Sequence, residues 1–260
     1  MKRIVKDIEP EILRQYRENN PADDWKKGFY KNSGKDGYPS VRDCLIAEQG
    51  GLCVYCEIDL KIDENANNDF RVEHFYPDNP RDDASRVGDG INYSLHWDNL
   101  FGCCHGGNVE TVVDKAVRYT APNVHCDIDK GNQDWTGILL NPISDIPSYP
   151  SVFIFDEDGL VNVNQADELI PLREKISNSI TLLNLHSKEL CKLRAAIVDK
   201  LREEIELMLE SGNSIENATY YLAQTYMSKN ENGLFNSPFF STIRWYLGPE
   251  ADRYLKSVGY

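Results

Sequence analysis

Cysteines at two separated places in one stretch of the chain constrain its fold more than any other feature of the sequence. The stretch runs from Leu52 to Asn132 and opens with Cys53-Val-Tyr-Cys56; its second cysteine group is Cys103, Cys104 and Cys126. Two thiolates separated by two residues form the commonest half of a tetrahedral structural zinc site. The sequence therefore predicts that the two groups meet and hold one zinc ion.

The second half of this zinc site has several candidate ligands. Cys103, Cys104 and Cys126 can each supply a thiolate, and His105 or His125 could replace one of them. The alternative is that the cysteines are small buried hydrophobic residues. A second cluster downstream of the first favours the zinc interpretation.

An acid and an imidazole lie side by side between the two cysteine groups, as Glu73-His74. Hydrolysis of a phosphodiester needs a base that activates water and a hard divalent cation that neutralises developing charge. A neutral imidazole suits the first task, and a carboxylate that binds Mg²⁺ suits the second. Side chains alternate along an extended strand, so a local twist must bring both groups to one phosphate. A histidine with a purely structural role is the alternative, and the position between the cysteine groups favours catalysis.

The order of these motifs resembles that of the HNH (His-Me finger) endonucleases whose core is stabilised by a zinc ion held by four cysteines. The order is CxxC, Glu-His-x-x-Pro, the pair Asn99-Leu100, a cysteine, and Cys126-x-x-x-Lys130. The resemblance implies an α+β fold, with a zinc-stabilised ββα-metal (HNH) core, N-terminal helices and an α-helical C-terminal region. It also implies a metal-dependent endonuclease that hydrolyses phosphodiester bonds in DNA.

Carried over to the matching positions, the resemblance implies a role for each residue of the catalytic site. Glu73 and Asp127 would bind the catalytic Mg²⁺ or Mn²⁺, and His74 would be the general base. Asn99 would orient that histidine, and Lys130 would contact a phosphate of the nucleic acid.

The zinc ligands follow from the same resemblance. The third cysteine of the family falls five residues after the Asn, which selects Cys104 over Cys103. Two features depart from the family pattern: a long insertion separates Cys104 from Cys126, and Asp127 stands where His or Asn is usual, with His105 as the second choice of ligand. The expected zinc ligands are Cys53, Cys56, Cys104 and Cys126.

The fuller pattern is closer to one subgroup, the retron-associated and Septu-type (PtuB-like) HNH nucleases of bacterial antiphage systems. The segments that carry this likeness are 48–56, 72–77, 95–102 and 126–132, all in about the first half of the chain. In that subgroup the nuclease works beside an ABC/SMC-like ATPase (PtuA-like) and, in the retron versions, with a reverse transcriptase and an RNA-DNA. The resemblance therefore implies the effector of an antiviral defence complex.

The net charge of −14 is unusual for a chain that binds nucleic acid, because phosphate contacts dominate such binding. The resemblance offers a reason: the partner would supply the basic surface, and the free nuclease would be held off DNA. Two alternatives stay open from the residues alone. One is a non-catalytic zinc-binding scaffold that docks a partner, and the other is an HNH-like nuclease that acts on RNA.

We expect two regions, a nuclease domain with an N-terminal helical scaffold (1–165) and a helical region that docks a partner (166–260). The seven clustered cysteines suit a reducing compartment, and Cys44 and Cys191 are expected in apolar helical faces. The absence of a long apolar run and the early charges at the N-terminus predict a cytoplasmic protein without a membrane span or signal peptide. We expect helices at 8–16, 41–49, 176–185, 190–209, 214–228 and 238–257, strands at 70–75, 136–141 and 151–155, and a loop at 22–39.

Overall fold

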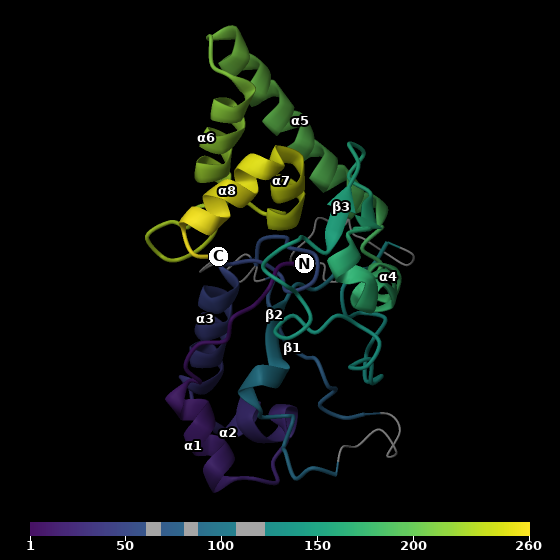
Figure 1. Ribbon diagram of the computed structural model, residues 1–260. Coiled ribbons are helices and arrows are strands. Elements are labelled where there is room, and N and C mark those ends of the chain that lie inside the picture. The colour runs from purple at the N-terminus through teal and green to yellow at the C-terminus, as the bar shows by residue number, and fades with distance from the viewer. Residues whose placement is uncertain (61–68, 81–87, 108–122) are drawn as a thin grey trace.

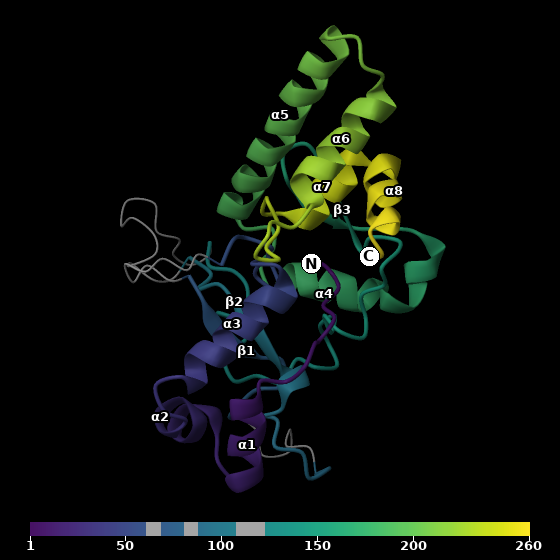
Figure 2. The ribbon, with the colours of Figure 1, turned by 90° about the vertical axis from the view of Figure 1, so that its left-hand side faces the viewer.

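The fold is taken from a computed structural model, in which residues 1–60, 69–80, 88–107 and 123–260 are described. The molecule is elongated, with α1, α2, α3, β1 and β2 at one end and α5 to α8 at the other (Figure 1). A quarter turn shows the same division, with α5 and α6 projecting as a hairpin (Figure 2). The described helices and strands combine into an α+β fold with two small sheets.

The elements follow one another from the N-terminal end to the helical end. The first set is α1 (Glu11–Asn19), a π-helical turn (Trp25–Phe29), α2 (Tyr30–Asn32), α3 (Gly37–Gln49), β1 (Arg71–His74), a 3₁₀ turn (Trp97–Asn99) and β2 (Leu100–Cys103). The second set is β3 (Phe153–Phe155), β4 (Val161–Val163), a 3₁₀ helix (Asp167–Leu172), α4 (Arg173–Leu182), α5 (Lys188–Glu210), α6 (Ile215–Met227), α7 (Phe240–Leu247) and α8 (Pro249–Ser257).

Each sheet is a pair of antiparallel strands. β1 pairs with β2 so that Arg71 lies opposite Cys103 and His74 opposite Leu100. β3 pairs with β4, and Asp156 closes their turn by accepting a hydrogen bond from the Leu160 amide at 2.8 Å. This confirms the strands expected at 70–75 and 151–155. Residues 126–132, which would open the helix of a ββα core, form turns rather than an α-helix.

The loop expected at residues 22–39 is wrong. Asp24 caps a π-helical turn by accepting hydrogen bonds from the amides of Lys27 and Gly28. The rings of Trp25 and Phe29 stack at 4.9 Å between centroids and are buried. Aromatic burial therefore orders a segment whose polar residues and glycines suggested a loop.

Two other expectations are corrected. Residues 136–141 form turns instead of a strand, because the amides of Ile138 and Leu139 donate to the Trp135 carbonyl rather than to a neighbouring strand. The helix expected at 238–257 is two helices, α7 and α8. Gly248 has φ +63° and the next residue, Pro249, lacks an amide hydrogen, so the helix breaks there.

Two clusters of buried apolar side chains stabilise the molecule. The first runs from the N-terminal segment through the cysteine stretch and both sheets to the start of α5, so it includes side chains on either side of residue 165. The second joins α5 to α6, α7 and α8, and it includes Leu52 from the cysteine stretch. The domain boundary near residue 165 stays a prediction. Within the described part of the chain, no helix is both long and apolar enough to span a membrane.

Candidate active site and metal centre

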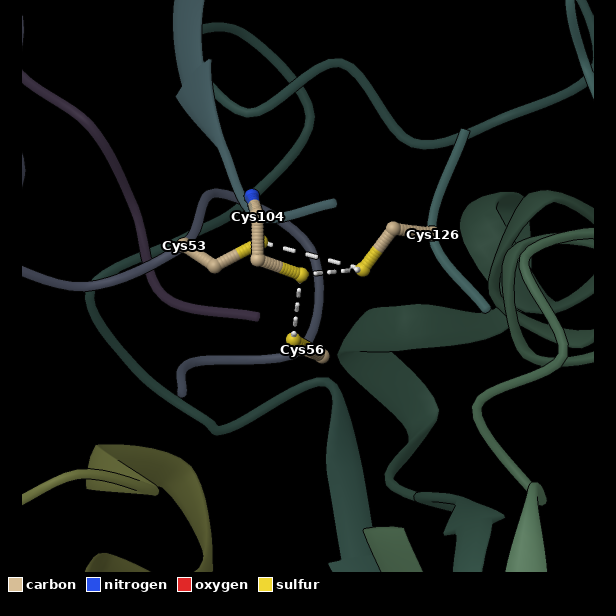
Figure 3. A group of neighbouring side chains, drawn as sticks. All are labelled: Cys53, Cys56, Cys104 and Cys126. Carbon is tan, nitrogen blue, oxygen red and sulfur yellow. Dashed lines mark hydrogen bonds between the residues drawn. The ribbon is translucent and has the colours of Figure 1, made fainter. Parts of the chain in front are cut away.

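Four buried cysteines point toward one another where β2, the CxxC turn and the segment after residue 122 meet (Figure 3). Their Sγ atoms all lie within 4.8 Å of one another. Adjacent pairs are 3.5 Å (Cys104 and Cys126), 3.6 Å (Cys56 and Cys104) and 3.7 Å (Cys53 and Cys126) apart. A tetrahedral zinc ion with bonds of ~2.3 Å separates its sulfurs by about 3.8 Å. The spacing and the all-thiol donor set fit one zinc ion.

The CxxC turn is placed by the end of α3. Gly50 ends that helix in the left-handed region with φ +64°, a conformation that glycine adopts readily. The side chain of Gln49, which is fully buried, donates to the carbonyls of Leu52 and Gly102 at 2.8 Å and accepts from the Gly102 amide at 2.6 Å. Gln49 thereby ties the first cysteine pair to strand β2.

Backbone amides point at two of the sulfurs, as they do in structural zinc sites. The amide of Cys104 donates to Cys53 Sγ, and the amide of Gly106 donates to Cys104 Sγ, both at 3.4 Å. Gly106 has φ +58°, and a Cβ there would lie 2.2 Å from the His125 carbonyl oxygen. Glycine is therefore required at the point where the chain turns away from the third cysteine.

The histidines and the fifth cysteine lie beside the four-cysteine cluster. His125 Nδ1 is 3.1 Å from Cys126 Sγ, and burial lowers the pKa of His125 to about 4. His105 Nδ1 lies 3.1 Å from Asp69 instead. The Cys103 thiol donates to Asp127 Oδ1 at 3.1 Å, so this residue connects the cluster with the acidic site.

That acidic site is formed by two buried carboxylates, Glu73 on β1 and Asp127 in the turn after Cys126. Glu73 Oε1 accepts a hydrogen bond from the Tyr55 hydroxyl at 3.1 Å and pairs with Lys130 Nζ at 2.5 Å. Burial raises the pKa of Glu73, but the Lys130 ammonium and a hydrogen bond with Asp127 outweigh it and hold this pKa below its usual value.

The pKa of Asp127 is shifted in the opposite direction from that of Glu73. Burial and the neighbouring Glu73 charge raise the pKa of Asp127 well above its usual range, although the Arg71 guanidinium opposes them. Arg71 pairs with Asp127 Oδ1 and donates to the Cys104 carbonyl at 3.0 Å. Two carboxylates therefore lie close together, and only one of them ionises easily. A divalent cation bound between them would offset their repulsion.

Lys130 is almost fully buried, with 1% of its surface exposed. Besides the pair with Glu73, its ammonium donates to the His74 carbonyl oxygen. The resemblance assigns this lysine to a phosphate of the nucleic acid. In this structure its ammonium instead donates to the Glu73 carboxylate and to the backbone of β1.

His74 faces different neighbours from Glu73, as alternation along a strand requires. Its Nε2 lies 3.0 Å from the Ser94 carbonyl oxygen, which fixes the hydrogen on Nε2 and leaves Nδ1 as a proton acceptor. The Trp25 ring lies edge-on to the imidazole, 5.5 Å between centroids. Burial lowers the pKa of His74 below its usual value of 6.5, so the ring is neutral near pH 7.

Asn99 closes the loop that follows His74. Its side-chain oxygen accepts from the Tyr76 amide at 2.7 Å, and its nitrogen donates to the carbonyls of Tyr76 and Tyr93 at 2.8 Å. Its carbonyl accepts from the Phe75 amide at 3.0 Å. Asn99 therefore acts on His74 through the backbone of the loop.

A cavity of about 580 Å³ opens next to the histidine's anchor, lined in part by Ser94, Asp78 and Asn132. The ammonium-bearing Lys26 and Lys27 also line it, together with other polar residues of the same segment. Its volume is in the range of about 300–1,000 Å³ in which small molecules are bound.

Several residues of the site were not anticipated from the sequence, although two carried a signal. Arg71 stands two residues before Glu73 on a predicted strand, so alternation puts both on one face with Asp127. Tyr55 lies inside the CxxC motif. Trp25 lies in the segment that was expected to be a loop. Ser94 contacts His74 through its backbone carbonyl, and a pattern of side chains cannot reveal such a contact.

The chain is similar to a curated protein that carries a descriptive name. Over 167 residues the chain is 29% identical to an Escherichia coli protein whose name describes it as a candidate HNH endonuclease of retron Ec83. The match covers 60% of this chain and 59% of that protein, so the chain spans less than two thirds of its relative's length. No protein-family model matches the chain. The similarity supports an HNH nuclease family, and the four-cysteine cluster is consistent with it.

Proposed function

We propose that this protein is a metal-dependent HNH endonuclease that hydrolyses phosphodiester bonds in DNA. The observation that carries the proposal is the state of His74: a neutral imidazole, anchored through Nε2 on the Ser94 carbonyl, with Nδ1 left to accept a proton. His74 directly follows Glu73 in the sequence, and the Glu73 carboxylate shares a buried site with Asp127. The retron-linked relative supports the same assignment.

In the proposed reaction, His74 Nδ1 takes a proton from the water that attacks phosphorus in line. Asn99 holds the loop that carries the imidazole, and Arg71 and Lys130 keep the two carboxylates in place. A Mg²⁺ or Mn²⁺ ion on Glu73 and Asp127, when bound, supplies charge neutralisation at the phosphate and at the departing 3′ oxygen. Lys130, which pairs with Glu73 in this structure, would keep that carboxylate ionised for the cation.

The four cysteines take a structural role in this proposal. A zinc ion on Cys53, Cys56, Cys104 and Cys126 would fix the CxxC turn against β2 and against the turn that carries Asp127. The hairpin of β1 and β2, together with that turn, would correspond to the ββα-metal core, with one turn where the family has a helix.

We further propose that the nuclease is the effector of a bacterial antiphage complex of the retron or Septu type, beside an ABC/SMC-like ATPase. The relative's name contains the word retron, and the net charge of −14 requires another source of basic surface for DNA. At the tip of the α5–α6 hairpin, Leu207 is 62% and Ile215 47% exposed. This tip projects from the molecule (Figure 2) and is where we place the partner contact.

The decisive experiment is plasmid nicking by the wild type and by His74→Ala, with Mg²⁺ or Mn²⁺, alone and with the co-encoded ATPase. We expect cleavage by the wild type only, with the substitution lowering the rate by about 10²-fold or more, as loss of a general base does. Cleavage only in the presence of the ATPase would identify it as the gate.

The controls separate the alternatives. His74→Ala must retain its metal content and melting temperature, because a loss of zinc would mean that this histidine is structural. Cleavage of RNA but not of plasmid by the wild type would favour the RNA-directed nuclease. No cleavage of either nucleic acid, with or without the ATPase, would favour the non-catalytic zinc scaffold.

A further inference from the structure

A second cavity lies where the two ends of the molecule meet. Its volume is about 500 Å³. Its walls come from segments far apart in sequence: the N-terminal residues 2–8, the end of α3, the segment after α6, and Tyr260. Both chain ends lie at this junction between α3 and the α6–α8 helices (Figure 1). The acidic site and the four-cysteine cluster contribute no residue to its lining.

The most unusual group in this cavity is the ammonium of Lys2. Only 7% of the residue is exposed, and among the residues that the structure describes no carboxylate forms an ion pair with it. The charges that act on it are Glu57, which attracts, and Lys229, which repels. Glu57 itself pairs with the N-terminal ammonium of Met1 at 3.0 Å and accepts hydrogen bonds from the amide and hydroxyl of Ser241, at 2.8 and 2.7 Å. A buried cation without a counter-ion is costly, and an anion in the cavity would offset that cost.

Lys2 is one of several cations that converge on the cavity. Lys229 Nζ lies 5.2 Å from the centroid of the Phe235 ring, and Lys2 Nζ lies 5.4 Å from the same centroid. Arg3 also lines the cavity; its guanidinium donates to the neutral Ser148 hydroxyl at 3.0 Å, and no described carboxylate forms an ion pair with it. Two ammonium groups near one ring, with a third basic residue in the same wall, contrast with the acidic charge of the whole chain.

The acidic residues of the same cavity do not cancel these charges. Glu48 pairs with Lys6 at 3.2 Å, so that cation and anion neutralise each other. Asp7 is exposed and accepts a hydrogen bond from the Ile8 amide at 2.8 Å. Among the described side chains that line the cavity, three cations then face one exposed carboxylate, and this balance favours a dianion.

We propose that this cavity binds the phosphate monoester of a nucleotide. The dianionic phosphate would lie between Lys2, Arg3 and Lys229, because lysine and arginine are the residues that recognise phosphate by charge and hydrogen bonding. The apolar part of the wall, which includes Val5, Phe235 and Tyr260, would take the nucleoside. The volume suits a nucleotide. Two sources carry this chemistry: a free mononucleotide and the 5′-phosphorylated end of a nucleic-acid strand.

The test is isothermal titration calorimetry on the full chain in the His74→Ala background without divalent cations, so that no strand is cut. The titrants are AMP, adenosine, and one single-stranded DNA oligonucleotide with a 5′-phosphate or a 5′-hydroxyl. We expect AMP to bind and adenosine not to bind. If the 5′-phosphorylated strand binds more tightly than AMP and the 5′-hydroxyl strand does not bind, a strand end is the source; the reverse preference identifies the free nucleotide.

Variants locate the binding. Lys229→Met, at an exposed position, and Lys2→Met should each weaken AMP binding by about tenfold or more. Lys192→Met, which removes an exposed lysine of α5, should leave it unchanged. The proposal is overturned if neither phosphorylated titrant binds, if adenosine binds as tightly as AMP, or if Lys229→Met and Lys192→Met behave alike. Because nuclease activity is not measured, these outcomes do not depend on the proposed catalytic function.

Discussion

Asn99 holds the loop after His74 through its side-chain amide. Asn99→Ala removes three side-chain hydrogen bonds, two to Tyr76 and one to Tyr93. Because these groups are buried, we expect the free energy of unfolding to fall by about 3 kcal/mol. Urea denaturation of the wild type and the variant measures this difference.

A matched control for that prediction is Asn162→Ala, since Asn162 is an exposed asparagine of strand β4. Exposed substitutions of this kind change stability by about 0.5 kcal/mol or less. If the two variants lose the same small amount of stability, the loop does not depend on Asn99.

Lys2 makes stability depend on pH in an unusual direction. Burial lowers the pKa of Lys2 to about 8 from its usual 10.5. Between these values the unfolded chain binds more protons than the folded chain, so the unfolding free energy rises as the pH rises. Below about pH 8 the folded protein bears the full free-energy cost of burying the charged Lys2 ammonium. The rise across this window can reach about 3 kcal/mol, at 1.36 kcal/mol for each pKa unit.

The comparison that isolates this effect is Lys2→Met against the wild type, by urea unfolding at pH 7 and pH 10. We expect the variant to be the more stable protein at pH 7 and the difference to shrink at pH 10. Lys6, whose pKa burial also lowers to about 8, is present in both proteins and cancels. An equal pH dependence of the two proteins would contradict the prediction.

At this scale the sequence was most informative where spacing along the chain carries the chemistry. The CxxC spacing indicated half of a zinc site, and the resemblance to the HNH pattern implied the four cysteines whose sulfurs cluster. The acid-histidine pair lies beside them. The surroundings of Lys130 could not be anticipated, because its contact with Glu73 depends on how the turn after Cys126 packs against β1. The same holds for Trp25, which reaches His74 from a distant segment.

Among the elements, the CxxC turn connects the two ends of the molecule. Glu57 follows the second cysteine, and its carboxylate receives the amide and hydroxyl of Ser241 in α7. Its carbonyl accepts from the Phe239 amide at 2.8 Å. A change in the conformation of this turn would therefore break the hydrogen bonds that hold the start of α7.

Cys56→Ser tests the structural role of this turn. Because structural zinc contributes folding energy directly, we expect the variant to lose bound zinc and to melt at a clearly lower temperature, with α7 affected in the same transition. Zinc content by a chromogenic chelator and circular dichroism melting measure both effects. Cys44→Ser, outside the cluster, should retain its zinc; a zinc-loaded Cys56→Ser with an unchanged melting curve would count against the site.

Elements with a strong local pattern were predicted well, and those ordered by distant contacts were not. The helices α5 and α6 follow from apolar spacing, and the end of α3 follows from Gly50. The turns at 136–141 lack a partner strand, which no local pattern reveals. The π-helical turn depends on Trp25 stacking on Phe29. Gly248 and Pro249 are a local signal for the break between α7 and α8. The apolar pattern continues across them, and it favoured one continuous helix.

For the whole molecule, the two clusters of buried side chains argue that the helical end and the cysteine stretch are mutually dependent. Leu52 belongs to the second cluster, while the first extends to Leu190 in α5. Composition could predict the acidic charge but not its distribution. The cavity around Lys2 joins residues from both chain ends, so its basic character appears only in the folded protein.

The edge-on contact between Trp25 and His74 gives the molecule a built-in optical probe. Indole emission is sensitive to an adjacent imidazole and is quenched when that imidazole becomes cationic. The fluorescence of the wild type minus that of His74→Ala therefore isolates the signal of this one pair from the other tryptophans. Metal loading and docking of a nucleic acid at this site could each be followed in real time, without a label and before any bond is cut.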